Sequence, residues 1–381
     1  MKISEAEFTS RLHALRHSLN ESGLDALLVN DEESIYYLTG LTFKSLERLF
    51  ILIITSKQVT FILPKMELAH LNAARNVDRL CTYWEYPAKE GERWSDVLLR
   101  ELGGAERVGV ERKAPAELLF AIAPRSACIL DLLECQRFVK SPAEIELIRQ
   151  AVGYCDFVAQ RINETCRYGT NELAVLGIGR EVQGKIMKET EYDLLTTSAL
   201  VFVWPGRISH QPHGIPSLLD TFTEGSHISL AFLRVNGYAA ECERTFFTTE
   251  PTADQKRLFA TMLEARRRSY AVLREGITAA EVDLAAKEFL IAEGHQEHLM
   301  HRTGHGIGLG NHEGPYIAEG DSTVLKENMV ISIEPGIYIE GIGGFRHSDT
   351  VRITKDGYER LTHTVDDLES LTFKARPEAH A

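Results

Sequence analysis

Side chains of the kinds that carry out acid–base chemistry gather in the second half of the sequence, next to glycines and prolines that mark turns. A histidine with a pKa near neutrality can take a proton from water and return it to a leaving nitrogen, while a nearby carboxylate orients the imidazole or binds a cationic substrate. Single loop histidines and Glu-Pro-Gly turns are common, so the interpretation depends on their number and order. We expect five catalytic residues: His213, Glu243, His305, Glu334 and His347.

The order of these motifs resembles the pita-bread superfamily, which includes aminopeptidase P, prolidase, methionine aminopeptidase and creatinase. The matching motifs are Gly-His-Gly at 304–306, His312, Glu-Pro-Gly at 334–336 and the strand at 344–350. The resemblance covers essentially the whole chain. It implies an α+β pita-bread catalytic domain preceded by a smaller α/β domain like that of prolidase and creatinase.

The resemblance also implies a set of metal ligands, and this chain departs from it. The peptidases of the superfamily hold two divalent metals with Asp, Asp, His, Glu and Glu, because paired hard cations need several carboxylate oxygens. Those positions are Leu230, Glu241, His305, Glu334 and Ser348 here. Leucine has no donor atom and serine is a poor ligand, so we expect no metal cofactor. The alternative is a single-metal site at Glu241, His305 and Glu334.

Creatinase is the member of the superfamily that works without metal, and this chain is similar to it at several points. Its glutamate after the second Asp position matches Glu243, and two of its active-site histidines match His213 and His305. Its substrate-carboxylate arginine matches Arg48, which follows a Tyr-Tyr-Leu-Thr-Gly motif at 36–40. The last-strand glutamate of creatinase falls on His347, so creatine itself is not expected as the substrate.

The expected roles follow from this resemblance. His213 activates water or protonates the leaving nitrogen, Glu243 and Glu334 bind a cationic portion of the substrate, and His305 and His347 stabilise the developing charge. The expected substrate-binding residues are Arg48 from a partner subunit, Trp204, Arg207, His312 and Arg346. Trp204 fits the end of a buried strand as well as a pocket, and Arg207 fits a solvated position equally well. For His295, His298 and His301 we expect a solvated or partly buried helix end.

Length and pattern predict two domains, because 381 residues exceed what one hydrophobic core usually supports. Residues 1–138 alternate helical and strand patterns. Strands are expected at 49–55 and 59–63, as a hairpin or an adjacent pair, and at 107–111 and 127–131. At 140–149 a complete helix-start signal follows, with Ser141 as N-cap, Pro142 in the first position and Glu144 three beyond the cap. We therefore expect the catalytic domain to span 139–381.

Composition limits the partners. A net charge of −13 repels a phosphate backbone, so nucleic acid is not expected as a partner. The apolar stretches are too short for a membrane span, and charges interrupt the N-terminal apolar runs, unlike a secretory signal. We expect a cytoplasmic homodimer that acts on a small-molecule substrate.

These observations favour a metal-independent, creatinase-like hydrolase. It would cleave a C–N bond in a small carboxylate-bearing nitrogen compound: an amidine, a guanidino compound, a cyclic amidine or an N-substituted amino acid. One alternative is an Xaa-Pro dipeptidase or aminopeptidase P-like enzyme with a remodelled single-metal site. Another is a non-catalytic pseudo-peptidase that binds a peptide or protein in the same pocket.

Overall fold

The structure is a computed structural model that describes residues 3–72 and 74–373. The chain divides into two compact units, Met1–Arg137 and Phe138–Ala381. This boundary lies one residue from the one expected. Among the helices of the described residues, none has the length and apolar composition that a membrane crossing requires.

The first unit is an α/β domain built on a six-stranded sheet in the order β4-β3-β2-β1-β5-β6. Apolar side chains of β1, β2 and β5 form its core with those of α4 and α5. The expected hairpin is confirmed, because β2 pairs antiparallel with β3. The elements are α1 (Glu5–Glu21), β1 (Ala26–Val29), α2 (Glu32–Thr39), β2 (Ile51–Ile54), β3 (Val59–Pro64), α3 (Leu68–Leu71), β4 (Arg79–Tyr83), α4 (Trp94–Leu102), β5 (Arg107–Val110), α5 (Ala116–Ala121), β6 (Ser126–Ile129) and α6 (Leu132–Phe138).

The second unit has an eight-stranded, largely antiparallel sheet in the order β11-β10-β12-β15-β9-β8-β7, with β16 paired to β15. Strands β13 and β14 form a separate pair. Its elements are α7 (Pro142–Thr165), α8 (Glu172–Glu189), β7 (Ser198–Trp204), β8 (His227–Val235), β9 (Tyr238–Phe246), α9 (Ala253–Val272), α10 (Ala279–Ala292), β10 (Gly304–Gly306), β11 (Glu313–Ile317), β12 (Val330–Ile333), β13 (Gly336–Ile339), β14 (Gly343–Arg346), β15 (Ser348–Thr354) and β16 (Gly357–Arg360).

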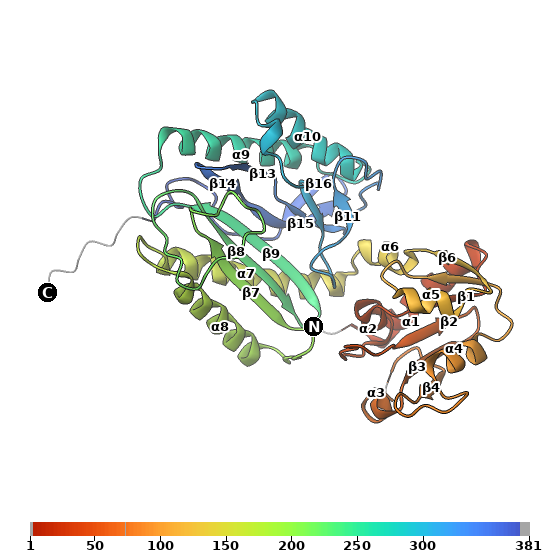
Figure 1. Ribbon diagram of the computed structural model, residues 1–381. Helices are drawn as coiled ribbons and strands as arrows, with labels where there is room; N and C mark the ends of the chain where they lie inside the picture. Colours follow the sequence, from red (N-terminus) through yellow and green to blue (C-terminus); the bar gives the residue numbers. More distant parts are fainter. Residues whose placement is uncertain (1–2, 73, 374–381) are drawn as a thin grey trace. The chain divides into compact units, whose positions relative to one another are not determined.

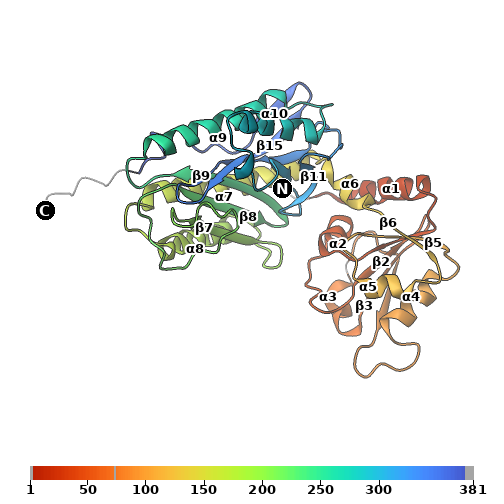
Figure 2. The same cartoon turned by 45° about the horizontal axis from the view of Figure 1, so that its top comes forward.

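Two helix pairs pack on this sheet (Figures 1 and 2). Helix α7 contacts β8 and β9, and α8 contacts β7. Helices α9 and α10 pack on each other, α9 contacts β12, β13 and β14, and α10 contacts β11. This arrangement of helices and sheet is the α+β pita-bread fold that was expected, preceded by the smaller α/β unit.

The helix-start signal of α7 is confirmed in detail. The Ser141 side chain accepts a hydrogen bond from the Glu144 backbone N–H at 3.2 Å, and the Glu144 carboxylate accepts one from the Ser141 N–H at 2.8 Å. The other Glu144 oxygen accepts from the Tyr238 hydroxyl at 2.9 Å, a bond that links α7 to the start of β9. The cap therefore fixes both the start of the helix and its position against the sheet.

A buried charge cluster joins β9, β15 and α9. Asp349 pairs with Arg244 of β9 and Arg266 of α9, and it accepts hydrogen bonds from the Tyr270 and Thr362 hydroxyls. All five side chains are buried or nearly so. Arg266 also pairs with Asp366, so two carboxylates and two guanidinium groups balance their charges here. Removal of Asp349 therefore leaves excess positive charge in the interior.

We predict that Asp349→Asn lowers the free energy of unfolding by about 3–5 kcal/mol, because it leaves Arg244 buried without its ion-pair partner and leaves Arg266 with Asp366 alone. Urea denaturation measures this change. The matched control is Asp254→Asn, which breaks an exposed pair with Arg257 and is expected to change stability by less than about 0.5 kcal/mol. Equal effects of the two substitutions would contradict the role given to the cluster.

Candidate active site

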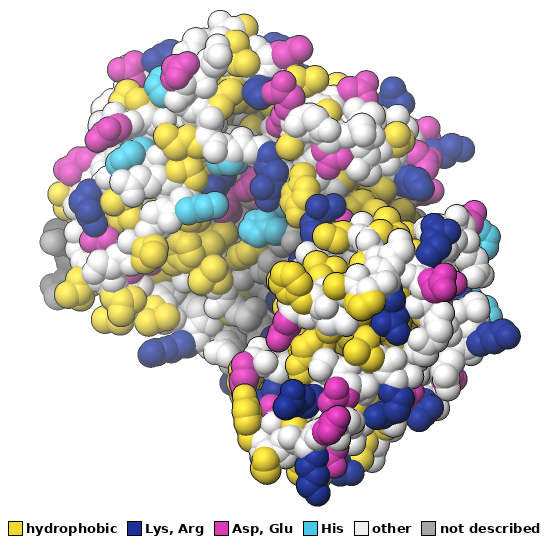
Figure 3. Space-filling view, turned by 45° about the vertical axis from the view of Figure 1, so that its right-hand side comes forward, with side chains coloured by type: hydrophobic (Ala, Val, Ile, Leu, Met, Phe, Trp, Pro, Cys, Tyr) yellow, Lys and Arg dark blue, Asp and Glu magenta, His cyan; other side chains and the backbone are white. Residues whose placement is uncertain are grey.

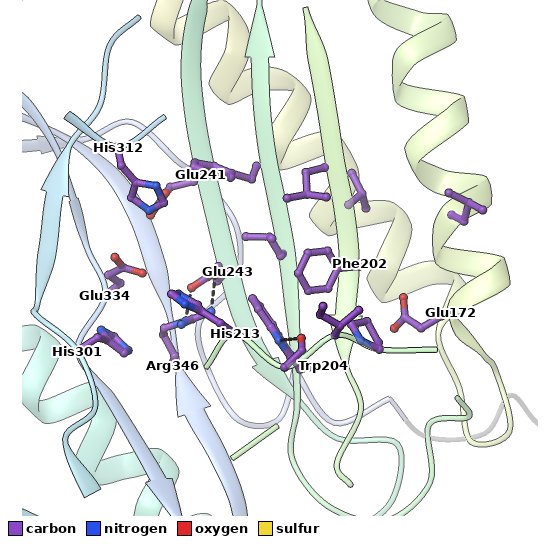
Figure 4. A pocket seen from close by; sticks show the side chains of 18 of the residues that line it. Glu172, Phe202, Trp204, His213, Glu241, Glu243, His301, His312, Glu334 and Arg346 are labelled. Atoms are coloured by element: carbon purple, nitrogen blue, oxygen red, sulfur yellow. Dashed lines mark hydrogen bonds and ion pairs between the residues drawn. The ribbon is translucent and has the colours of Figure 1, made fainter. Parts of the chain in front are cut away.

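The second unit contains a cavity of about 860 Å³. Figure 3 shows a face of this unit on which hydrophobic and histidine side chains gather around a hollow. One side of the cavity is apolar and comes mainly from β7, β8 and the segment between them: Leu200, Phe202, Trp204, Ile215, Leu218, Leu230 and Phe232. The other side carries titratable groups, with Glu241, Glu243, His301, His312, Glu334 and Arg346 close together (Figure 4).

Three of the expected residues converge at the charged side. The Nε2 atom of His305 lies 3.4 Å from a carboxylate oxygen of Glu241 and 3.4 Å from one of Glu334. One ligand atom from each of the three residues lies within 4.8 Å of the others. Strands β9 and β10 and the end of β12 supply them, so three segments distant in sequence bring their donors to one point.

The donor atoms of this triple are arranged for a cation. The Nδ1 atom of His305 lies 3.0 Å from the Gly306 carbonyl oxygen, which can only accept, so Nδ1 carries the proton and Nε2 keeps its lone pair. Nε2 is buried and makes no hydrogen bond with a described residue. Burial lowers the pKa of His305, but Glu241 and Glu334 outweigh that effect and raise it to about 10. The gap between three lone pairs therefore attracts either a proton or a metal ion.

The two departures from the expected ligand set have separate consequences. Ser348 donates a hydrogen bond of 2.5 Å to Glu241, so it orients that carboxylate instead of binding an ion itself. Leu230 packs in an apolar cluster with Trp204 and Ile228, next to Phe202 and Phe232. It therefore forms part of the apolar wall. A single-metal site fits these residues, and a paired-metal site does not.

Glu243 has an internal cationic partner, which corrects the expected role. The Nη2 atom of Arg346 donates to Glu243 at 2.7 Å, and Arg346 Nε also contacts the carboxylate. Burial raises the pKa of Glu243 and Arg346 lowers it, and a two-point contact with a permanently charged guanidinium keeps the carboxyl ionised. The guanidinium lies 4.8 Å from the ring of Trp204. Glu243 is therefore already paired and does not wait for a cationic substrate.

His301 is a site residue that the sequence interpretation missed. Its Nδ1 donates to the Arg302 carbonyl at 2.7 Å, which leaves Nε2 to accept from the Tyr338 hydroxyl at 2.7 Å. Burial lowers the pKa of His301 to about 4, so the ring is neutral at neutral pH. The signal in the sequence is its position four residues before His305, whereas the spacing from His295 and His298 predicted a helix end.

Two further expected histidines line the cavity. The His312 ring lies 4.0 Å from that of His305, and its pKa is lowered by burial and by His305. His213 lies on the segment after β7 and makes no hydrogen bond with a described residue. Trp204 also lines the cavity, and its Nε1 donates to the Gly214 carbonyl at 2.8 Å. This bond ties the segment that carries His213 to the end of β7.

Three expected residues lie elsewhere. His347 is fully buried between Arg346 and Ser348, and because side chains of an extended chain alternate in direction, it points away from the cavity and packs on Phe259 of α9. Arg207 is exposed and pairs with Asp220, so it is outside the cavity lining. Arg48 lies in the first unit and pairs with Glu85 and Glu47. Its role in a partner's pocket stays a prediction.

Glu172, at the start of α8, is a second residue that the sequence interpretation missed. Its carboxyl accepts from the Val203 backbone N–H at 3.0 and 3.2 Å and lines the cavity near Phe202 (Figure 4). Burial raises the pKa of Glu172 to about 8. The site therefore includes a carboxyl group that is mostly protonated at neutral pH.

Comparisons with known proteins agree with this geometry. Residues 146–355 match the model of metallopeptidase family M24, and residues 11–171 match the creatinase/prolidase N-terminal domain. An Xaa-Pro dipeptidase of Pyrococcus horikoshii is 30% identical over 362 residues, which cover 92% of this chain and 96% of that protein. The crystal structure of dipeptidase PepE from Mycobacterium ulcerans has a TM-score of 0.85 at 28% identity and covers 98% of this chain and 100% of its own. The crystal structure of the prolidase from Pyrococcus horikoshii OT3 has a TM-score of 0.79 at 27% identity, and the match covers 94% of this chain and 99% of that one.

The raised pKa of Glu172 predicts that the stability of the protein depends on pH. Its folded-state pKa of about 8 lies above the ordinary value of 4.5, so ionisation penalises the folded state increasingly as the pH rises between those values. Relative to Glu172→Gln, the wild-type protein should lose about 2–4 kcal/mol of unfolding free energy between pH 5 and pH 9. Denaturant titrations at several pH values measure the difference.

The control for this prediction is Glu181→Gln on the same helix, which removes a carboxylate that is paired with Arg161 near the surface. Its stability difference from wild type should not vary with pH over the same range. A flat difference for Glu172→Gln as well would show that the carboxyl ionises as it does in water.

Proposed function

The chain belongs to metallopeptidase family M24, and we propose that it hydrolyses the C–N bond of a short peptide with one divalent ion held by Glu241, His305 and Glu334. The observation that carries the proposal is the convergence of these three donors at the charged side of the cavity. The relatives named Xaa-Pro dipeptidases support a peptide bond as the target. The metal-independent, creatinase-like mechanism favoured by the sequence is not supported, and its single-metal peptidase alternative is better supported.

The ligand set suits one catalytic ion. Glu241, His305 and Glu334 would hold the ion with three protein ligands, the number found in catalytic zinc sites. An ion held there would supply Lewis acidity for the activation of water and of the scissile carbonyl. Ser348 holds one oxygen of Glu241, so the other oxygen stays directed towards His305.

The remaining residues of the cavity hold or move protons. His213 has no hydrogen bond to a described residue, so its imidazole is available to give a proton to the leaving nitrogen. Tyr338 donates to His301 while it accepts from the Arg346 Nη1 atom at 3.1 Å, a chain that fixes the neutral state of His301. The Glu243–Arg346 pair therefore positions the Tyr338 hydroxyl and, through it, His301.

We predict that the protein binds one Mn²⁺ per chain and hydrolyses the dipeptide Leu-Pro only when the ion is present. Titration calorimetry gives the stoichiometry, and amino-acid release after chelation and after Mn²⁺ addition gives the activity. Glu334→Gln removes a ligand and should weaken Mn²⁺ binding by at least about 10-fold. Glu224→Gln changes an exposed carboxylate outside the cavity lining and should bind as the wild type does.

Each alternative function has its own outcome in this experiment. Full activity after chelation would support the metal-independent mechanism and contradict the single-metal one. Binding of Mn²⁺ without hydrolysis of any Xaa-Pro dipeptide would favour a non-catalytic binding protein. Two ions per chain would contradict the consequence drawn from Leu230 and Ser348.

We also propose a homodimer, in which Arg48 of one chain reaches the cavity of the other. Light scattering should give twice the chain mass. If Arg48 contributes to substrate binding, Arg48→Ala should raise KM for Leu-Pro without changing the amount of bound Mn²⁺. An active monomer would contradict the dimer, and an unchanged KM would remove Arg48 from the site.

A further inference from the structure

One buried histidine of the second unit has no hydrogen-bond partner among the described residues. His295 follows helix α10 and is 6% exposed, and both of its ring nitrogens are buried without a hydrogen bond to a described residue. Buried polar atoms are nearly always satisfied, and an exception indicates that a water molecule or an ion belongs beside them. His295 is outside the lining of the catalytic cavity. It therefore marks a second place in this unit where a ligand is expected.

A second imidazole lies beside His295 and is held there by the backbone. His298 ends the short 3-10 turn Gln296–His298, and its N–H donates to the His295 carbonyl at 2.9 Å. The two ring centres lie 5.8 Å apart, and the Nδ1 atom of His298 is also buried without a hydrogen bond to a described residue. Zinc binds an imidazole nitrogen at about 2.0–2.1 Å, which places each ring centre about 3 Å from the ion. One ion can therefore join the two rings.

Glu293 can supply a third ligand. It is exposed at the C-cap of α10, and its carboxylate forms no ion pair with a described residue. Burial lowers the pKa of His295, His298 and Arg257 lower it further, and Glu293 acts in the opposite direction. The ring is therefore neutral at neutral pH and keeps a lone pair, and the charge of Glu293 is felt there. An exposed side chain changes rotamer readily, so this carboxylate can turn towards an ion bound by the two rings.

Arg257 of α9 is a cation close to His295, and its charge opposes the binding of a metal ion. It pairs with Asp254 at 3.3 Å, so part of that charge is already balanced. Both side chains of this pair are exposed, and water screens what remains of the charge. Arg257 therefore weakens the attraction for a cation at the two histidines without cancelling it.

The donor set of this cluster differs from that of the active site. His295, His298 and Glu293 offer two imidazoles and one carboxylate, whereas the catalytic triple offers one imidazole and two carboxylates. Imidazole ligands suit zinc, whereas manganese prefers oxygen ligands and binds a given site more weakly. Mn²⁺ is therefore expected at the catalytic triple alone, and Zn²⁺ at both places.

We propose that His295, His298 and Glu293 bind a zinc ion that fixes the connection between α10 and the segment that carries His301 and His305. Three protein ligands and one water molecule would complete the tetrahedral shell that zinc adopts. The ion would join the end of the helix to the turn from which the chain runs on to β10. Its role is structural, and the three ligands take no part in bond cleavage.

The experiment titrates Zn²⁺ into the wild type and into Glu334→Gln, in which the catalytic triple has lost a ligand. Calorimetry should give two ions per chain for the wild type and one tightly bound ion for Glu334→Gln. Adding His298→Asn to Glu334→Gln should weaken the binding of that ion by at least about 10-fold. Zn²⁺ should also raise the midpoint of thermal unfolding of Glu334→Gln but not that of the double variant, because an ion that binds only the folded chain stabilises it.

The matched control is His13→Asn, which removes an exposed imidazole of α1 and should leave the number of bound ions unchanged. Thermal unfolding without zinc checks that each variant is folded. Glu293→Gln alters an exposed side chain and keeps the test informative if His298→Asn does not fold. It should weaken Zn²⁺ binding in the Glu334→Gln background, whereas Glu297→Gln, in the same turn, should not.

The outcomes separate this inference from the proposed function. Zn²⁺ binding that is lost in Glu334→Gln, or that is unchanged by both His298→Asn and Glu293→Gln, overturns the inference and leaves the catalytic ion intact. If the wild type binds one ion that survives Glu334→Gln and is lost with His298→Asn, the inference is supported while the proposed catalytic ion fails. Absence of any bound Zn²⁺ overturns both, and a water molecule then satisfies His295.

Discussion

Burial of carboxylates on neighbouring positions of one strand is the constraint on which the site depends. Glu241 and Glu243 point in the same direction from β9 and are nearly inaccessible to water. An isolated buried carboxylate is too costly to persist, so each needs a cation. Arg346 is a fixed cationic partner for Glu243. The cationic partner of Glu241 is either His305 as an imidazolium or a bound metal ion, so a proton and a metal ion can exchange at this position.

The same strand alternation divides the structure into a reactive face and a structural face. Arg346 and Ser348 point towards the cavity, whereas His347 and Asp349 point towards α9. Asp349 joins β9 to α9 through Arg244 and Arg266, and Arg244 also donates to the Ser348 carbonyl at 2.8 Å. The buried structural cluster therefore fixes the backbone that aims Arg346 and Ser348. The ion pair on the cavity face, Glu243–Arg346, belongs to the site, whereas the ion pairs of Asp349 on the opposite face hold the strands to α9.

Motif order in the sequence was sufficient to predict the fold, and local patterns predicted the pairing of β2 with β3 and the α7 cap. The triple of Glu241, His305 and Glu334 was predicted only as the alternative to a metal-free site. The sequence interpretation failed where direction or partners decide the role. His347 stands in the right segment, but the two-residue period of an extended chain turns it away from the cavity. Glu243 was predicted to need a cation, and its partner Arg346 was predicted separately, because the register that pairs them is invisible in the sequence. Glu172 and Arg302 sit outside the motifs, and only the folded chain brings them to the cavity.

Charge balance explains why one ion suits this site. With His305 neutral, the carboxylates Glu241, Glu243 and Glu334 and the guanidinium groups of Arg302 and Arg346 that line the cavity sum to a charge of −1, so one divalent cation leaves +1. A second divalent ion would leave an excess of +3 in a buried cavity, where uncompensated charge is costly. Leu230 and Ser348 remove the two side chains that a second ion would need, and Arg346 already supplies a fixed positive charge beside Glu243. The loss of two ligands and the presence of the Glu243–Arg346 pair are therefore parts of the same electrostatic solution.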